Sequence, residues 1–237
     1  MSETRSRWRR AIAIAGDWVR RAPITYLWLV VLLATTVVQH RVSPEKLDAI
    51  LGRRSTNIAN LLHDPLRAFF GSLLWLDGAY WVPYFLGFTI FLATAERWMG
   101  SRRYLAVGLA GHILATLISQ GLVGAAIQTG VANPSLRYAT DVGVSYFMAA
   151  VIGVLSYYLP RPWRWIYIAG AVVVFCGPLL DLPVSFTAVG HASALAIGFA
   201  CYPLVRGKPM LNVDALLKRI RGYAPASLRP SARHKNS

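Results

Sequence analysis

Six long apolar stretches dominate this sequence and constrain its fold more than any other feature. A helix that crosses a bilayer needs about 20 mostly apolar residues, because about 30 Å of hydrocarbon is spanned at about 1.5 Å per residue. The stretches that approach this length are Ile24 to Val38, Trp81 to Ala95, Tyr104 to Val123, Val142 to Leu159, Trp163 to Leu180 and Pro183 to Val205. They predict an all-α fold, a polytopic membrane bundle of six transmembrane helices.

A seventh apolar stretch, Leu61 to Leu76, is a weaker candidate. Asp64 and Arg67 interrupt it and Asp77 closes it. Burying such charges in lipid costs several kcal/mol, by the order of magnitude of insertion scales. We therefore expect this segment to lie in the membrane interface.

The basic residues indicate how the chain is oriented. With six spans and an inner N-terminus, 19 of the 25 Lys and Arg residues fall on the inner side. The outer side keeps Arg41, Lys46, Arg53, Arg54, Arg67 and Arg137. This asymmetry follows the positive-inside rule and predicts a multi-pass protein of the plasma (inner) membrane with both termini in the cytoplasm. It also accounts for the net charge of +15 without nucleic acid as a partner.

Three regions follow from this reading. Residues 1–23 form a basic cytoplasmic N-terminus, residues 24–205 the six-helix membrane domain, and residues 206–237 a basic cytoplasmic tail. In the tail, Asn212 to Ile220 is a short amphipathic candidate for attachment to the lipid surface, and Ala224 to Ser237 has the composition of a disordered segment. No loop is long enough for a separate soluble domain, so function is expected in the bundle.

Ionisable residues within spans are costly and mark candidate functional sites. His112 and His191 are the clear ones, whereas Asp141 and Asp181 sit at expected outer helix ends where water can solvate them. If the fourth helix begins at Asp141 and the sixth at Val184, Ser145 and His191 lie about 6 and 10 Å below the outer boundary. The two side chains then share a leaflet, and an imidazole near a serine hydroxyl can act as its general base.

Depth alone favours a simpler reading of this pair. Serine hydroxyls within spans usually bond to a backbone carbonyl or a neighbouring helix, and a lone histidine often does the same. His112 enters from the cytoplasmic side and is expected to form an interhelical hydrogen bond rather than to join Ser145.

Two motifs change this balance. Gly143-Val-Ser145 resembles the Gly-x-Ser motif of the rhomboid family of intramembrane serine proteases, in which the serine is the nucleophile. His191-Ala-Ser-Ala-Leu-Ala-Ile-Gly198 resembles the sixth-helix motif of that family, in which the histidine is the base. Ala194 and Gly198 keep a small-xxx-small spacing that lets two helix backbones approach closely.

A third stretch completes the resemblance, which spans roughly residues 61–205. Glu96-Arg97-Trp-Met-Gly100-Ser101 is similar to the turn that follows the second span in rhomboids, although it also reads as an ordinary capped loop between helices. The resemblance implies cleavage of transmembrane protein substrates near the outer membrane face by Ser145 and His191. Besides these substrates, the implied partner is the lipid bilayer, and no cofactor is implied.

The second span departs from the family pattern. Rhomboids usually carry His-x-x-x-Asn there, and Tyr80 and Tyr84 occupy those places in this chain. Because such side chains bind the oxyanion, their loss can cost about 3 to 4 kcal/mol of transition-state stabilisation. Tyr84, with the backbone amide of Ser145, is a candidate oxyanion donor, while both tyrosines also fit the role of interface aromatics. Tyr146 replaces a common glycine after the serine and narrows the site.

Two other functions remain open. The tyrosine substitutions suggest a catalytically inactive rhomboid-like protein that binds transmembrane helices. A transporter or lipid-handling bundle is less well supported, because few polar residues lie at mid-membrane and no paired repeat is visible. The sequence lacks a His-Glu-x-x-His zinc motif, a mid-span aspartate pair and a phosphate-binding glycine motif, so neither a metal nor a cofactor is expected.

Overall fold

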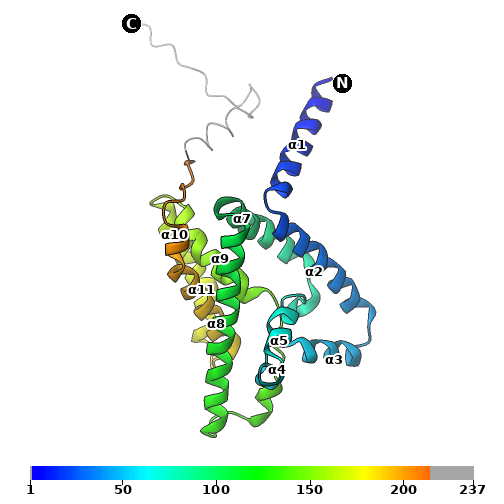
Figure 1. Cartoon of the computed structure of the whole chain (residues 1–237), viewed down its shortest axis with the longest axis vertical. Helices are drawn as coiled ribbons and strands as arrows, with labels where there is room; N and C mark the ends of the chain where they lie inside the picture. Colours follow the sequence, from blue (N-terminus) through cyan, green and yellow to red (C-terminus); the bar gives the residue numbers. More distant parts are fainter. Residues whose placement is uncertain (1, 214–237) are drawn as a thin grey trace.

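The described chain is built from helices. The computed structural model describes residues 2–213, without the side chains of residues 2–7, 10 and 11, and this part contains no strand. The α-helices, drawn in Figure 1, are α1 (Ser2–Arg20), α2 (Pro23–Arg41), α3 (Pro44–Arg54), α4 (Ile58–His63), α5 (Pro65–Ser72), α6 (Trp81–Gly87), α7 (Ala93–Met99), α8 (Ser101–Gln128), α9 (Ser145–Leu155), α10 (Trp163–Cys176), α11 (Phe186–Ala200) and α12 (Tyr202–Val205). A π-helical segment, η2 (Phe88–Leu92), joins α6 to α7.

Each expected span coincides with a helix or with consecutive helices. Within residues 2–213, three segments are long and apolar enough to cross a membrane alone, namely α2, α8 and Trp163–Leu180, which is α10 with its last 3-10 turn η5 (Gly177–Leu180). Pro65–Ala79 and Trp81–Met99 are long and apolar enough only when taken together, and they are bent by 116° relative to each other. Ser145–Tyr158 and Phe186–Ala200 are shorter apolar helices. The fold class, an all-α membrane bundle, is confirmed, and the count of six crossings stays a prediction.

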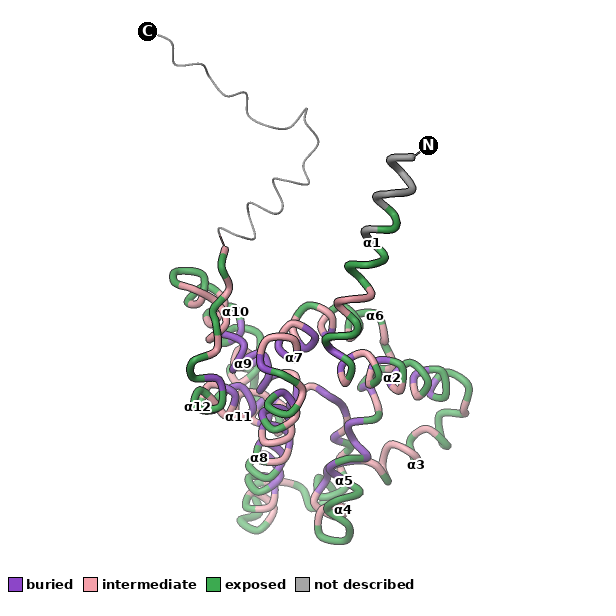
Figure 2. Tube along the Cα trace, turned by 45° about the horizontal axis from the view of Figure 1, so that its top comes forward, coloured by how far each residue is buried: buried purple, intermediate pink, exposed green. Residues whose placement is uncertain are grey.

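Helices α8, α9 and α11 form the centre of the bundle, and Figure 2 shows buried residues concentrated along them. Glycines allow the close approach. A Cβ at Gly153 of α9 would lie 2.6 Å from the Leu195 carbonyl oxygen of α11, and one at Gly198 of α11 would lie 2.8 Å from the Ala150 carbonyl carbon of α9. A Cβ at Gly111 of α8 would overlap the side chain of Ala150. The backbones of α9 and α11 are therefore in direct contact, and α8 packs closely on α9.

The start of the fourth helix differs from the sequence-based expectation. Residues 141–144 are not helical, and α9 begins at Ser145 rather than at Asp141. The reason is local, because Gly143 has a φ of +127°, a conformation that favours glycine and that no α-helix contains. Likewise α11 begins at Phe186 rather than Val184. The depths of Ser145 and His191 that assumed earlier helix starts are therefore wrong.

The segment expected in the interface forms two short helices, α4 and α5. Asn57 caps α4 through the backbone N–H of Asn60, and Asp64 caps α5 through that of Arg67. Ala68 and Phe69 of α5 are buried. The segment packs on the bundle, and its location at the membrane interface stays a prediction.

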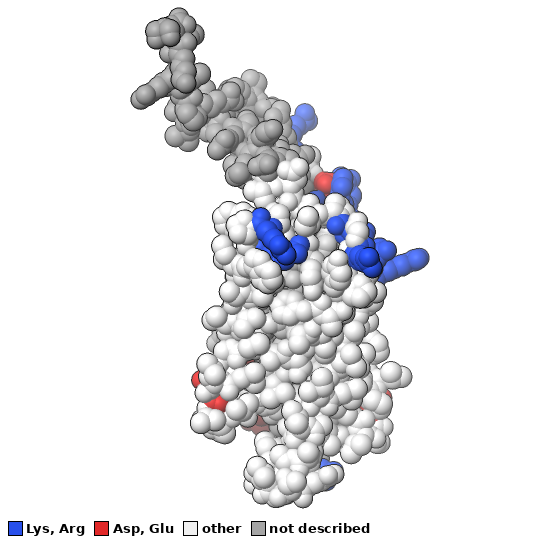
Figure 3. All heavy atoms as spheres, turned by 90° about the vertical axis from the view of Figure 1, so that its left-hand side faces the viewer, with Lys and Arg blue, Asp and Glu red and all other residues white. Residues whose placement is uncertain are grey.

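Charge is distributed unevenly along the bundle. Helix α1 and residues 206–213 lie at the same end of the molecule (Figure 1). On the face seen in Figure 3, Lys and Arg gather at this end, and a broad belt below them is free of charge. The belt is what a lipid-facing surface requires. Most of the amphipathic candidate at 212–220, and all of the tail at 224–237, lie outside the described residues.

We predict that Gly198→Ala destabilises the bundle. The new Cβ has no space against the α9 backbone at Ala150, so α9 and α11 must separate, at a cost of about 1 to 3 kcal/mol for an overpacked site. Unfolding of the purified protein in mixed micelles measures the effect. Gly121→Ala in α8 is the matched control, because a Cβ there meets nothing within 4 Å. Equal unfolding midpoints for the two variants would contradict the prediction.

Candidate functional site

Ser145 is the first residue of α9 and is half-buried. The turn that precedes Ser145 is held in place by the end of α5, because the backbone N–H of Gly143 donates to the Ser72 carbonyl at 3.1 Å. The hydroxyl of Ser145 makes no hydrogen bond with another described residue. It therefore lies where the free N–H groups of a helix N-terminus gather, with no structural bond that would hold it.

His191 is held between two aromatic rings in the first half of α11. The Tyr146 ring meets it edge-on at a centroid distance of 5.3 Å, and the Phe175 ring of α10 lies at 5.8 Å. The Nε2 atom of His191 is buried and has no hydrogen-bond partner among the described residues. The imidazole is thus positioned by packing rather than by polar contacts.

Ser145 and His191 come from parallel helices that touch each other. Ala149 and Leu195, each one turn further along its helix, belong to the same buried cluster. Tyr146 overlaps any Cβ placed at Gly190, so the two helices also touch at the level of the candidate residues. No hydrogen bond joins Ser145 to His191, but catalytic hydrogen bonds are often long before substrate binds.

The two oxyanion candidates have different surroundings. Tyr80 precedes α6 and is 71% exposed. Tyr84 lies within α6 and is partly buried against the main core. One turn beyond Tyr84, a Cβ at Gly87 would lie 3.4 Å from the sulfur of Met148, which itself follows Ser145 by one turn. The structure thus brings Tyr84, rather than Tyr80, toward the level of Ser145.

An apolar cavity of about 400 Å³ lies beside this site. It is bounded by the second expected span, α9 and α10, with Gly87, Phe91, Met148, Ile152, Tyr167 and Phe175 among its lining residues. The π-helical segment η2 contributes Phe91. Such segments are rare and often occur at functional sites, and the sequence carried no sign of this one.

Glu96 is buried in the turn that resembles the rhomboid motif. Its carboxylate accepts the backbone N–H groups of Ile24 (3.1 Å) and Thr25 (2.9 Å) and the Thr25 hydroxyl (2.8 Å). It also accepts the Ser101 hydroxyl at 2.7 Å. The N-cap residue of α2 is Ala22, which has no side chain that can accept a hydrogen bond. Glu96, from a distant part of the chain, therefore accepts the free N–H groups of the first turn of α2, and its negative charge stabilises this helix N-terminus.

The rest of the motif serves the same turn. Gly100 has a φ of +87°, and its N–H donates to the Glu96 carbonyl at 2.8 Å, which ends α7. The guanidinium of Arg97 lies 4.0 Å from the centre of the Trp18 ring, a cation–π contact. These residues, singled out as motif support, therefore have a structural role.

His112 is an interhelical hydrogen bonder, as its position suggested. Its Nε2 lies 3.1 Å from the Phe69 carbonyl oxygen and 3.2 Å from the Ser72 hydroxyl, both in α5. The ring is almost fully buried. His112 thus fastens α5 to α8 and makes no contact with Ser145.

A protein-family model now adds independent evidence. The model described as "Rhomboid-like protein" matches residues 17–211, more than half of the chain. This chain belongs to the rhomboid-like protein family. No curated protein and no solved structure matches it. The resemblance seen in three short motifs therefore extends over nearly the whole described region.

Asp141 of this rhomboid-like protein is a buried site that the sequence did not reveal. Its carboxylate accepts the Thr56 hydroxyl at 3.1 Å and the Gln120 amide at 3.3 Å. Burial raises the pKa of Asp141 to about 6; these hydrogen bonds lower it and the charge of Asp77 raises it further. The prediction that Asp141 is a solvated boundary residue was wrong, because Ser55 and Thr56, 86 and 85 residues away in the chain, hydrogen-bond to it and cover it.

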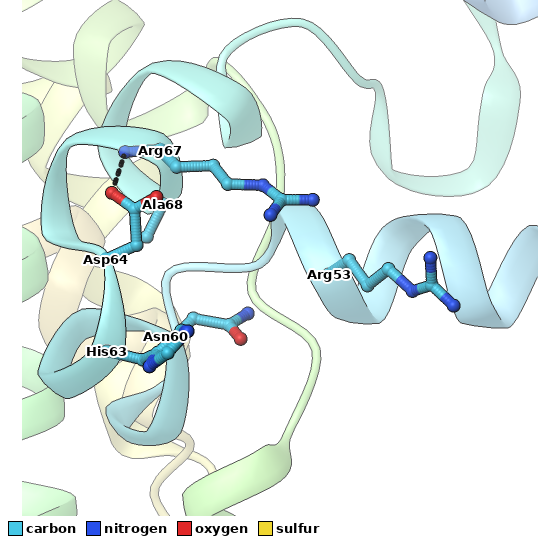
Figure 4. A pocket seen from close by; sticks show the side chains of 6 residues that line it. All are labelled: Arg53, Asn60, His63, Asp64, Arg67 and Ala68. Atoms are coloured by element: carbon cyan, nitrogen blue, oxygen red, sulfur yellow. Dashed lines mark hydrogen bonds between the residues drawn. The ribbon is translucent and has the colours of Figure 1, made fainter.

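A polar pocket opens between α3, α4 and α5, and none of the candidate catalytic or oxyanion residues lines it. Figure 4 shows Arg53 reaching from α3, and Asn60, His63 and Arg67 from the two short helices beside it. Its charged side chains are exposed, and the Arg67 backbone N–H donates to Asp64 at 3.1 Å. Within residues 2–213, no three His, Cys, Asp or Glu side chains are grouped so as to hold a metal.

We predict that Glu96→Gln destabilises this rhomboid-like protein by about 2 to 3 kcal/mol. Both carboxylate oxygens accept hydrogen bonds, so an amide must turn its NH2 group toward a donor and leave that donor unsatisfied. Unfolding in mixed micelles measures the loss. Glu45→Gln, which removes an exposed carboxylate from α3, is the control. The prediction fails if both variants unfold at the same midpoint.

Asp141 predicts a defined pH dependence. An unfolded aspartate titrates near pH 3.9, as model peptides do, so between about pH 4 and 6 only the folded chain keeps the proton. The free energy of unfolding therefore falls by about 2 to 3 kcal/mol as pH rises through this window, and then stays level. Asp141→Asn should remove that fall. Parallel unfolding curves for wild type and variant across the window would disprove the assignment.

Proposed function

We propose that this rhomboid-like protein is an intramembrane serine protease that cleaves transmembrane proteins near the outer membrane face. Ser145 is the nucleophile and His191 the general base and acid. The observation that carries the proposal is the contact of α9 and α11, since both residues lie at the same ends of two helices whose backbones touch. Two packed helices can hold a nucleophile and a base at a constant separation, as acyl transfer needs.

The chemistry follows from these positions. His191 removes the proton of the Ser145 hydroxyl as it attacks the scissile carbonyl, then gives that proton to the leaving amine. Water afterwards hydrolyses the acyl-enzyme, with the same imidazole as base. The N-terminus of α9 supplies backbone N–H groups and a positive dipole end for the oxyanion, and the Tyr84 phenol is the candidate side-chain donor.

The apolar cavity supports a transmembrane helix as substrate. It lies between the second expected span and α10, and Val174 in its lining is exposed, as are Leu86 and Ile90, the chain neighbours of the lining residues Gly87 and Phe91. A helix from the lipid can pack against such a surface without desolvating polar groups. From there an unwound end of that helix has a short path to the N-terminus of α9.

Orientation supports the same proposal. The excess of Lys and Arg at the end that carries α1 fits the cytoplasmic face of an inner or plasma membrane, with both termini on that side. Ser145, at the outer end of α9, then works near the opposite face. No nucleic acid and no cofactor enter this mechanism.

The alternative is a catalytically inactive member that binds transmembrane helices. Specific observations favour it, because Ser145 and His191 share no hydrogen bond and the Tyr146 ring packs on the imidazole. Tyr80 and Tyr84 replace the usual oxyanion residues. Such a protein would use the apolar cavity alone.

Labelling with a serine-reactive phosphonate separates the two functions. We expect the detergent-solubilised wild type to be labelled, Ser145→Ala not to be labelled, and His191→Ala to react at least about 100-fold more slowly, the usual loss of a general base. Ser193→Ala, which removes a serine two residues from His191, is the control and should label normally.

The same experiment can contradict the protease function. Absence of labelling in the wild type, or equal labelling of wild type and Ser145→Ala, supports the inactive helix binder. If the enzyme is active, Tyr84→Phe should lower turnover of a transmembrane substrate about 100-fold by removing an oxyanion donor. Full turnover by Tyr84→Phe excludes that role for the phenol and leaves the backbone donors.

A further inference from the structure

A second cavity lies at the Arg-rich end of the bundle, far from Ser145. Its volume is about 350 Å³, within the range of small-ligand sites. The end of α1, helix α7 and the segment after α12 form its walls, with Trp18, Arg21, Arg97, Trp98, Tyr158 and Met210 among the lining residues. The proposed protease chemistry uses none of them.

Two hydrogen-bond donors in this wall have no acceptor. The Nη1 atom of Arg97 and the Nε1 atom of Trp18 are both buried, and neither has a partner among the described residues. The two side chains are stacked, with the guanidinium 4.0 Å from the ring centre. Unsatisfied buried donors are costly, above all on a charged group, so a ligand with acceptor oxygens would stabilise this arrangement.

The cavity is also positively charged. Arg21 and Arg97 line it, and no carboxylate does. The nearby Asp17 accepts a hydrogen bond from Arg21 at 2.9 Å in an exposed pair, which offsets little of this charge. The carboxylate of Glu96 is occupied by α2 and Ser101. The site therefore attracts an anion that brings several acceptor oxygens.

The wall of the cavity is fixed by hydrogen bonds from the chain that follows α12. Trp98 Nε1 donates to the Pro209 carbonyl at 2.8 Å, and the Leu211 N–H donates to the Tyr158 carbonyl at 2.7 Å. Three aromatic side chains, Trp18, Trp98 and Tyr158, thus gather around this cavity beside Arg21 and Arg97. Tryptophan and tyrosine prefer the depth of lipid headgroups.

We propose that this cavity binds a phosphate group, supplied by the headgroup of an anionic phospholipid in the adjoining leaflet. On binding, the Arg97 and Trp18 side chains turn their buried N–H groups toward the phosphate oxygens and donate to them, and Arg21 contributes charge. Basic pockets between helices at a cytoplasmic face commonly hold such headgroups. The site would tie α1, α7 and the segment after α12 together, whether or not the protein cleaves substrates.

Native mass spectrometry of the full chain tests the proposal. The detergent-solubilised protein is offered phosphatidylglycerol and phosphatidylcholine with the same acyl chains. We expect the wild type to retain phosphatidylglycerol preferentially, and Arg97→Gln to bind it about tenfold more weakly through loss of a charged donor. Trp18→Phe keeps the aromatic ring, removes one donor and should weaken binding about threefold. If Arg97→Gln does not fold, the Trp18→Phe variant alone still tests the proposal.

Arg102→Gln is the matched control. It removes an exposed charge at the same end of the bundle, outside the cavity, and should bind as the wild type does. Equal phosphatidylglycerol retention by wild type, Arg97→Gln and Trp18→Phe would overturn the proposal, as would equal losses in Arg97→Gln and Arg102→Gln. A last measurement adds inorganic phosphate in excess. If phosphatidylglycerol stays bound, the lipid is the source of the phosphate group. If inorganic phosphate binds and displaces phosphatidylglycerol, free phosphate is the ligand of the same site.

Discussion

A single buried carboxylate, that of Glu96, orders a path that runs the length of the bundle. It fixes the start of α2 against α7 and α8. Helix α2 in turn holds the segment before α6, because Trp28 donates to the Leu73 carbonyl and Gln39 to the Leu76 carbonyl. In the same part of the chain, the Ser72 carbonyl accepts the Gly143 N–H. This hydrogen bond holds the turn that leads into α9, whose first residue is Ser145. A charge at one end of the molecule thereby supports the candidate nucleophile at the other.

The sequence predicted the helices well because lipid imposes a strong rule on composition. Apolar runs of the right length, such as Tyr104 to Val123 within α8, have few alternatives to a helix. The small-xxx-small spacing of Ala194 and Gly198 also predicted the close approach of this helix to a neighbour, and Gly198 does lie against the α9 backbone. Patterns of this kind are local, and a single sequence is enough to read them.

Features that depend on distant partners were not predictable in this way. Asp141 looked like a solvated helix end, but Thr56 and Gln120 enclose it, and nothing in the local sequence announces either contact. The π-helical turn at Phe88–Leu92 leaves no local signature, and the backbone of Gly143 moved the start of α9 by one turn. The candidate site was therefore predictable as a set of residues, while its geometry, including the Tyr146 ring against His191, was not.

The short helix α9 has a consequence for the chain around it. Ser145–Tyr158 has 14 residues and rises only about 21 Å at the helical rise per residue, well below the thickness of a typical hydrocarbon core. Because α9 is buried against α8 and α11, other parts of the chain rather than lipid must cover its ends. At the N-terminal end this cover includes the non-helical residues 141–144, which the Gly143 N–H fastens to the Ser72 carbonyl. A short helix at the centre thus leaves room inside the bundle for irregular backbone, which a membrane protein tolerates only where protein encloses it.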